Sequence, residues 1–142
     1  MPVFIDPEKA LSSIRKVEDI FLVLEGDLLV CDTYVDSKTF DYLALAQKAT
    51  SIKILTENVQ NETRFRRDLT AFAKEYKIPI EVRKTAGKLH DRYVISLSGL
   101  LLFGSNIKDI GKKQSFVVQL SSDFAKQIAF AFNQVWNAAP KF

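Results

Sequence analysis

The sequence predicts an α/β sandwich built around a mixed sheet. Short apolar segments rich in β-branched residues alternate with longer segments whose apolar residues recur every three or four positions. Strands that alternate with helices favour a sheet covered by helices. A Ser98-Gly99 turn then joins two apolar segments, as in an antiparallel hairpin, which makes the sheet mixed. With 142 residues, the chain is long enough for one domain with a sizeable core.

The first half of the chain contains three turn or cap signals. Pro7 suits the first turn of a helix, and Glu25-Gly26-Asp27 is typical of a turn between strands. Asp36 or Ser37 can cap a helix. In chain order, we expect a helix over 7–15, strands over 20–24 and 28–31, a helix over about 36–48, and a strand over 51–55.

The second half begins with a helix that Asn61 can cap. Its apolar residues fall on one stripe: Phe65, Leu69, Phe72 and Ala73. The elements expected after it are strands over 78–82, 90–97, 100–103 and 115–120, a brief helical turn that Gly104-Ser105 opens, and a helix over about 122–137.

The last helix carries a second apolar stripe that we expect to face the core. This stripe consists of Phe124, Ile128, Ala131 and Val135. Phe130 projects from the opposite side. It is either a half-exposed aromatic side chain, which is common, or a contact with a second subunit.

The composition excludes several classes of protein. The chain has no run of 18 apolar residues, so no membrane span is expected, and its first residues do not resemble a signal peptide. Cys31 is the only cysteine and is expected to be a buried hydrophobe, which fits the cytoplasm. One cysteine and one histidine make a zinc site unexpected, and we expect no cofactor. Residues 1–17 are expected to be an N-terminal segment or short helix preceding a domain over 18–142.

Positive charge is concentrated in one segment. The chain carries a net charge of +3, but residues 83–113 hold seven cationic and two acidic residues, a net +5, which leaves −2 for the rest. Such a cluster is often only a solvated basic face. Here it coincides with the only histidine and a Gly-Ser turn, so we favour an anion-binding site.

The candidate site centres on His90. Residues two apart in a strand share a face, so His90 and Arg92 are expected to point one way, with Asp91 and Tyr93 pointing the other. Gly104-Ser105 precedes a helical turn whose free N–H groups favour an anion. The ligand-binding candidates around this centre are Lys88, Gly104, Asn106, Lys108, Lys112 and Lys113.

This arrangement resembles the phospholipase D superfamily, whose motif is His-x-Lys, four residues, Asp, six residues and Gly-Ser-x-Asn. His90 matches the histidine, Arg92 falls at the lysine, and Gly104-Ser105 matches Gly-Ser without insertion. Segments 32–36 and 52–56 also look like the first strands of that family's domain. The resemblance covers nearly the whole chain and implies a phospholipase D-like α/β/α sandwich with a mixed central sheet.

A divergent branch of the family has a similar variant of the motif, in which Leu-His-Asp-Arg is followed by Lys-Asp-x-Gly-Lys-Lys. Here these letters stand at 89–92 and 108–113. The branch includes phospholipase D-like domains found beside microtubule-interacting-and-transport domains, together with bacterial and archaeal relatives of uncertain role.

The resemblance also implies a mechanism and a dimer. In active members, one histidine attacks phosphorus and a second histidine from another half-domain protonates the leaving group. A chain with one histidine would need a twofold homodimer in which each subunit supplies His90. The catalytic candidates are His90, Arg92, Ser105 and Asp32, the last as a substitute for the family aspartate at the end of a strand.

Three departures weaken the case for catalysis. Leu97 stands at the family aspartate, Ile107 at the asparagine, and arginine replaces lysine. Positioned acid–base groups contribute about 10²–10⁴-fold each, so turnover should suffer more than anion binding.

We therefore expect a domain that binds a phosphate-bearing ligand, either nucleic acid or a phospholipid headgroup, with weak or no turnover. One alternative is a homodimeric, metal-independent nuclease or phosphodiesterase with His90 as nucleophile. A second alternative is a dimeric interaction or regulatory domain with a vestigial cleft.

Overall fold

The computed structural model describes residues 2–142 and shows a mixed seven-stranded sheet in the order β1-β9-β8-β7-β2-β4-β6. Strands β2, β4 and β6 run parallel to their neighbours in that group, whereas the other pairs are antiparallel. The sheet strands are β1 (Val3–Ile5), β2 (Glu25–Cys31), β4 (Lys48–Thr56), β6 (Ile80–Lys84), β7 (Arg92–Ser96), β8 (Gly99–Phe103) and β9 (Ser115–Leu120). Strands β3 (Tyr34–Val35) and β5 (Asn58–Val59) form a separate pair.

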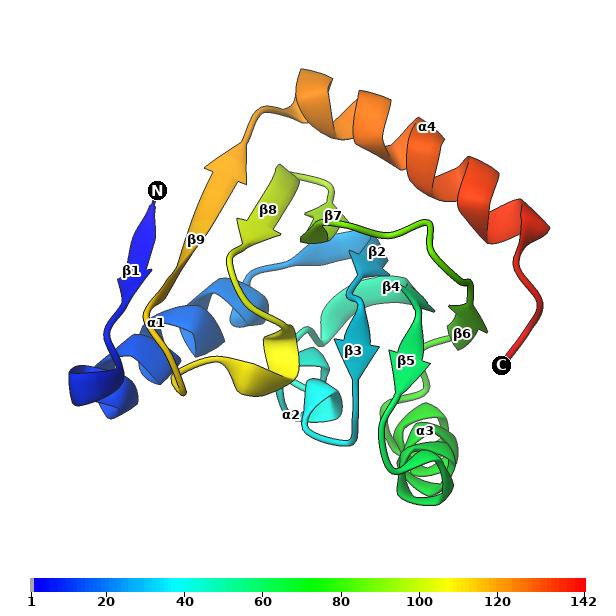
Figure 1. The fold of residues 1–142 in the computed structure, drawn as a ribbon, viewed down its shortest axis with the longest axis horizontal. Helices are drawn as coiled ribbons and strands as arrows, with labels where there is room; N and C mark the ends of the chain where they lie inside the picture. Colours follow the sequence, from blue (N-terminus) through cyan, green and yellow to red (C-terminus); the bar gives the residue numbers. More distant parts are fainter. Residues whose placement is uncertain (1) are drawn as a thin grey trace.

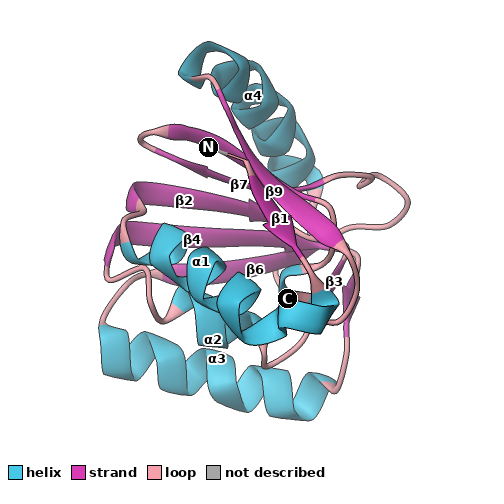
Figure 2. Ribbon diagram, turned by 90° about the vertical axis from the view of Figure 1, so that its left-hand side faces the viewer, coloured by secondary structure: helices cyan, strands magenta, loops and turns pink. Residues whose placement is uncertain are grey.

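Helices cover both faces of this sheet, which confirms the predicted α/β sandwich (Figures 1 and 2). Helices α1 (Ala10–Leu22), α2 (Thr39–Leu43) and α3 (Glu62–Tyr76) lie on one face, and α4 (Ser122–Ala138) lies on the other. Two 3-10 turns, η1 (Pro7–Lys9) and η2 (Ile107–Asp109), complete the fold. The larger part of the core lies under α1, α2 and α3 and includes Val17, Phe21, Leu28, Val30 and Ile54.

The predicted strand over 20–24 is wrong, because those residues largely belong to α1. Ile20 and Phe21 are buried, whereas Leu22 and Val23 are exposed, so burial follows a helical period rather than alternation. A short continuous apolar run does not distinguish a buried strand from the end of a helix. Helix α1 also runs past residue 17, where the sequence had suggested a boundary.

Two further helix predictions need correction. The helix expected over about 36–48 is the short α2, and β4 already begins at Lys48. Asn61 does precede α3, but its φ of 51° is left-handed and its side chain makes no capping hydrogen bond. The predicted strands over 28–31, 51–55, 100–103 and 115–120 are confirmed within the observed strands.

Helix α4 is present as predicted, but its buried side is displaced by one residue from the predicted stripe. The buried residues are Ala125, Phe132 and Trp136, whereas Phe124 is exposed. Phe132 and Trp136 are packed with Cys31 and Leu55 of the sheet in a second apolar cluster.

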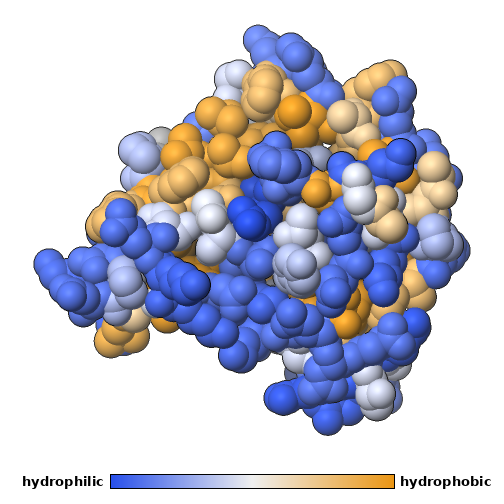
Figure 3. Space-filling view, viewed as in Figure 1, coloured by the Kyte–Doolittle hydropathy of each residue, from blue (hydrophilic) through white to orange (hydrophobic). Residues whose placement is uncertain are grey.

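Apolar side chains also reach the surface along β9 and at the start of α4. Phe4 and Phe116 are partners across β1 and β9, and both are about half exposed, as is Phe124. Figure 3 shows an apolar region over β9 and the start of α4. Phe130 is 66% exposed, which agrees with its predicted position on the outer side of α4. None of the helices in residues 2–142 combines the length and hydrophobicity needed to cross a membrane.

Candidate anion-binding site

Strand register brings the sequence-predicted segments together at one end of the sheet. Tyr93 of β7 pairs with Cys31 of β2, so Asp32 follows beside Arg92. Arg92 itself pairs with Phe103 of β8, so the loop that begins at Gly104 starts next to it. The end of β2, the start of β7 and the loop after β8 therefore meet.

Arg92 is held by an amide from the Gly-Ser loop. Its Nε donates to Oδ1 of Asn106 at 3.1 Å, and Oγ1 of Thr33 donates to the same oxygen at 3.1 Å. Within residues 2–142 the guanidinium makes this bond through Nε, which leaves its two Nη groups for a ligand. Thr33 was not predicted as a site residue, because a single threonine after a strand carries no signal in the sequence.

Asp32 lies wholly buried behind the same loop. Its Oδ2 accepts a hydrogen bond from the Ile107 N–H at 2.9 Å, and its Oδ1 has no hydrogen-bond partner within residues 2–142. Burial raises the pKa of Asp32 to about 7, although the backbone N–H groups of Ile107 and Tyr34 and the Arg92 charge oppose the rise. The observed contact of Asp32 is thus with the loop backbone.

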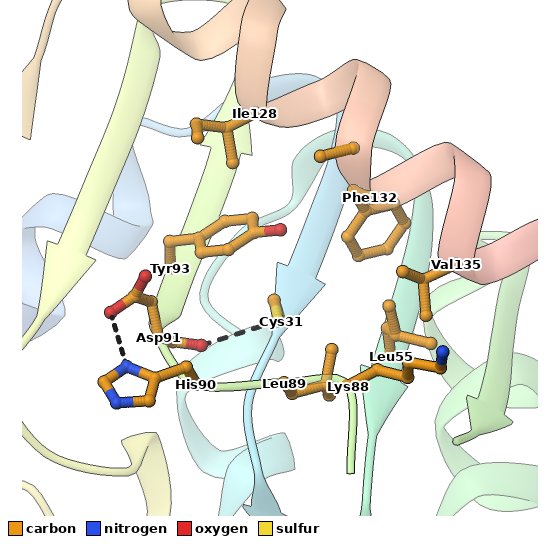
Figure 4. Close-up of a pocket in the computed structure, with 11 residues that line it drawn as sticks. Cys31, Leu55, Lys88, Leu89, His90, Asp91, Tyr93, Ile128, Phe132 and Val135 are labelled. Atoms are coloured by element: carbon orange, nitrogen blue, oxygen red, sulfur yellow. Dashed lines mark hydrogen bonds and ion pairs between the residues drawn. The ribbon is translucent and has the colours of Figure 1, made fainter. Parts of the chain in front are cut away.

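His90 is on the surface, two residues before β7 begins. Its side chain is 97% exposed, and its Nδ1 lies 3.4 Å from Oδ1 of Asp91 (Figure 4). The expectation that His90 and Asp91 point to opposite faces is wrong, because both precede the strand and its alternation does not apply to them. Among the described residues, the carboxylate that contacts the imidazole is Asp91, whereas sequence reasoning had favoured Asp32.

The segment that carries His90 is anchored by Glu57, from the loop that follows β4, and by Cys31, at the end of β2. Oε2 of Glu57 accepts hydrogen bonds from the N–H groups of Lys88 and Leu89, at 2.8 and 3.1 Å. Sγ of Cys31 donates to the Asp91 carbonyl at 3.5 Å. Glu57 was not predicted, since its position 31 residues before Lys88 gives no indication of this contact.

The lysines of the basic segment differ in how freely their ammonium groups can contact a ligand. Nζ of Lys108 lies 3.0 Å from Asp109 and its side chain is only 10% exposed, and Lys112 contacts the same carboxylate at 3.0 Å. Burial alone would raise the pKa of Asp109, but these two ammonium groups lower it. Lys88 and Lys113 are exposed and form no ion pair with any residue in 2–142.

The two small residues of the loop have different roles. The Ser105 hydroxyl donates to the Asn106 carbonyl at 3.2 Å and can rotate toward a ligand. Gly104 packs closely against β9, since a Cβ there would lie 2.7 Å from Oγ of Ser115. Glycine is therefore required at 104 by the close approach of the two chain segments.

A cavity of about 200 Å³ lies under α4, with His90 and Asp91 at its rim (Figure 4). Phe132 and Cys31 form part of its wall. Cys31 is buried, as predicted, and burial raises the pKa of its thiol to about 12, so it carries no nucleophilic thiolate near neutral pH. Residues 2–142 contain no cluster of three histidine, cysteine or acidic side chains that could hold a metal ion.

Sequence comparison gives no match, either to a protein-family model or to a curated protein. Structure comparison does give matches. Nuc of Salmonella typhimurium, a phospholipase D family member, superposes with a TM-score of 0.68 at 14% identity, covering 100% of this chain and 96% of that chain. NucT of Helicobacter pylori gives 0.68 at 6% identity, covering 100% and 99%.

Two larger proteins contain a similar domain. TrmBL2, an archaeal chromatin protein with a novel mode of DNA binding, gives a TM-score of 0.62 at 15% identity, covering 99% of this chain and 54% of that chain. Polyphosphate kinase of Porphyromonas gingivalis gives 0.60 at 12% identity, covering 99% and 26%. Together with the sheet order and the two helical layers, these matches show that this chain has the fold of a phospholipase D-like domain.

Proposed function

We propose that this domain binds a phosphate-bearing ligand through Arg92, Ser105, Lys88 and Lys113, with weak or no turnover. The observation that carries the proposal is the Arg92–Asn106 contact. It orients a guanidinium beside the Gly-Ser loop, and neither Nη group is hydrogen-bonded to an acceptor in residues 2–142. A guanidinium that is already oriented loses little entropy when it forms two parallel hydrogen bonds to a phosphate.

Nucleic acid is the ligand that we favour over a phospholipid headgroup. Two proteins of this fold are named for ligands with repeating phosphates: TrmBL2 for DNA binding and the Porphyromonas enzyme for polyphosphate. A polyanion would also contact the exposed Lys88 and Lys113, which form no ion pair with any other described residue. Binding of this kind depends steeply on salt because counterions are released.

Weak turnover follows from how His90 is held. A nucleophilic imidazole needs a partner that fixes its orientation, whereas the His90–Asp91 pair is long and exposed to solvent. Asp32, the predicted substitute for the family aspartate, is engaged with the Ile107 N–H. The Asp91 contact nevertheless favours one second candidate: a homodimeric, metal-independent phosphodiesterase in which two His90 residues meet across a twofold axis.

Binding is tested by fluorescence anisotropy with a labelled single-stranded oligonucleotide, and with anionic vesicles as the second ligand. We expect oligonucleotide affinity to fall as salt rises, and Arg92→Ala to weaken it about tenfold or more. Arg92→Lys should recover only part of the loss, because lysine cannot form the bidentate contact. Arg15→Ala, an exposed cation on α1, is the matched control and should change little.

Two results would decide against nucleic acid as the ligand. Binding of vesicles but not of the oligonucleotide would identify a lipid headgroup as the ligand. Binding of neither at low salt would remove the function altogether. Cleavage of a phosphodiester in the presence of a chelator, abolished by His90→Ala, would instead establish the enzymatic candidate.

A further inference from the structure

The backbone at 87–89 forms a small concavity that an internal carboxylate fills. The N–H groups of Lys88 and Leu89 both point at Oε2 of Glu57, at 2.8 and 3.1 Å. Successive backbone N–H groups that converge on one point form a nest, an arrangement that binds anions in proteins. Here the occupant is the chain's own carboxylate oxygen.

Gly87 creates the nest. Its φ is +66°, in the left-handed region, which turns the chain so that the next two N–H groups face the same side. Apart from its two chain neighbours, no residue among 2–142 has an atom within 4 Å of the position that a Cβ would occupy there. Glycine is therefore needed at 87 for its backbone conformation and not to make room for a neighbour.

The nest lies within the predicted site. Lys88 and Leu89, whose N–H groups form the nest, come immediately before His90 in the chain. The ammonium group of Lys88 is exposed. Glu57 reaches it from the loop that follows β4, and a backbone hydrogen bond from Thr85 to Thr56 at 2.9 Å holds the two segments together. Glu57 is only half-buried, so its carboxylate can leave the nest and be hydrated without a large penalty.

We propose that this nest is a subsite for a phosphate oxygen, and that Glu57 is an internal competitor which the phosphate displaces. The inference rests on the proposed phosphate-binding function and adds a regulatory contact to it. Glu57 closes the subsite when no ligand is present. A purely structural tether would behave in the opposite way, since its removal would loosen the segment and weaken binding.

The test follows the Lys88 and Leu89 amides by NMR while inorganic phosphate is added to ¹⁵N-labelled protein. Glu57→Gln keeps a neutral acceptor of the same shape, and Glu57→Ala empties the nest. Relative to wild type, we expect phosphate to bind several-fold tighter to Glu57→Gln and about tenfold or more tighter to Glu57→Ala, because a charged competitor has been removed. Asp19→Asn, an exposed acid on α1, is the matched control for loss of one negative charge and should bind as wild type does.

A second substitution separates occupation of the nest from a general charge effect. In the Glu57→Ala background, Gly87→Ala disfavours the left-handed conformation and should abolish the gain in affinity. The proposal would be overturned if phosphate affinity rose equally in Glu57→Gln and Glu57→Ala and if Gly87→Ala did not reverse that rise. Such a result would show only the effect of removing one negative charge. Lower phosphate affinity in both Glu57 variants would show a tether and overturn it as well.

The readout also distinguishes this inference from the function on which it rests. Phosphate could shift the amide signals of Arg92, Asn106 and Ile107 but not those of Lys88 and Leu89. This result would refute the nest and leave the proposed function standing. A response of no amide in any variant would remove both. Glu57→Gln has an acceptor for the two hydrogen bonds. If Glu57→Ala does not fold, Gly87→Ala is therefore made in the Glu57→Gln background, where it should likewise abolish the gain in affinity.

Discussion

At the scale of single residues, the protonation state of Asp32 makes the stability of the fold depend on pH. It is wholly buried, one of its oxygens lacks a partner within residues 2–142, and its pKa is raised to about 7. The native state therefore holds a proton on Asp32 between about pH 4 and pH 7 that the unfolded chain releases. The contribution of Asp32 to the free energy of unfolding is fully present below the pKa that Asp32 has in the unfolded chain. This contribution is lost as the pH rises through about 7, the pKa in the native state.

We predict that the free energy of unfolding falls by up to roughly 4 kcal/mol between pH 4 and pH 8 because of this group alone. Asp32→Asn should flatten that dependence and make the protein more stable than wild type at pH 8. Urea denaturation at several pH values measures both effects. An unchanged pH profile in Asp32→Asn would show that other groups are responsible.

Gly104→Ala tests the close contact between the loop and β9. The added Cβ would lie 2.7 Å from Oγ of Ser115 and 2.9 Å from the Phe116 ring, so we predict a loss of about 1–3 kcal/mol in stability. Ser115→Ala in the same chain should recover part of the loss. Chemical denaturation of the single and double variants gives the answer, and a neutral Gly104→Ala would contradict the contact.

At the scale of elements, α4 shows what decides the orientation of an amphipathic helix. Both possible stripes are apolar in the sequence, and the buried one contains the two large aromatic residues Phe132 and Trp136. Their rings stack with centroids 5.8 Å apart, and Arg83 lies over the Trp136 ring at 4.7 Å. Aromatic area thus outweighs the smaller apolar side chains of the other stripe.

The observed face of α4 predicts a contrast between neighbouring aromatic residues. Phe132→Ala should cost about 3–5 kcal/mol of unfolding free energy, because Phe132 is 1% exposed and its removal leaves a cavity. Phe130→Ala, on the exposed side, should stay within about 0.5 kcal/mol. Equal costs in urea denaturation would show that the helix is rotated from its position in this structure.

At the scale of the whole molecule, the proposed dimer stays a prediction. A shared site with two His90 residues requires a particle of about twice the 16.1 kDa chain mass, which sedimentation velocity measures directly. If the exposed Phe130 is a subunit contact, Phe130→Asp should shift the particle toward the monomer. A monomeric wild-type protein at its highest soluble concentration would contradict the shared site. A dimer unaffected by Phe130→Asp would place the interface elsewhere.

At this scale, fewer of the cations in residues 83–113 are free of an acidic partner than the sequence suggested. Of the cations between 83 and 113, Lys108 and Lys112 share the single carboxylate of Asp109, and Arg83 is paired with Glu81. The basic surface near the candidate site is therefore smaller than a count of residues implies. A salt titration should accordingly give a shallower slope than contact with all seven cations would.

The sequence by itself determined the class of fold and the meeting of Arg92 with the Gly-Ser loop. Both follow from local periodicity and motif spacing, because a hairpin between β7 and β8 brings Arg92 beside residue 104 whatever else surrounds it. Only the tertiary structure decided the end of α1, the buried face of α4, the partners of Asp32 and Lys108, and the occupation of the nest by Glu57. These depend on contacts between residues far apart in the chain or on competition between alternative packings, and local pattern carries no information about either.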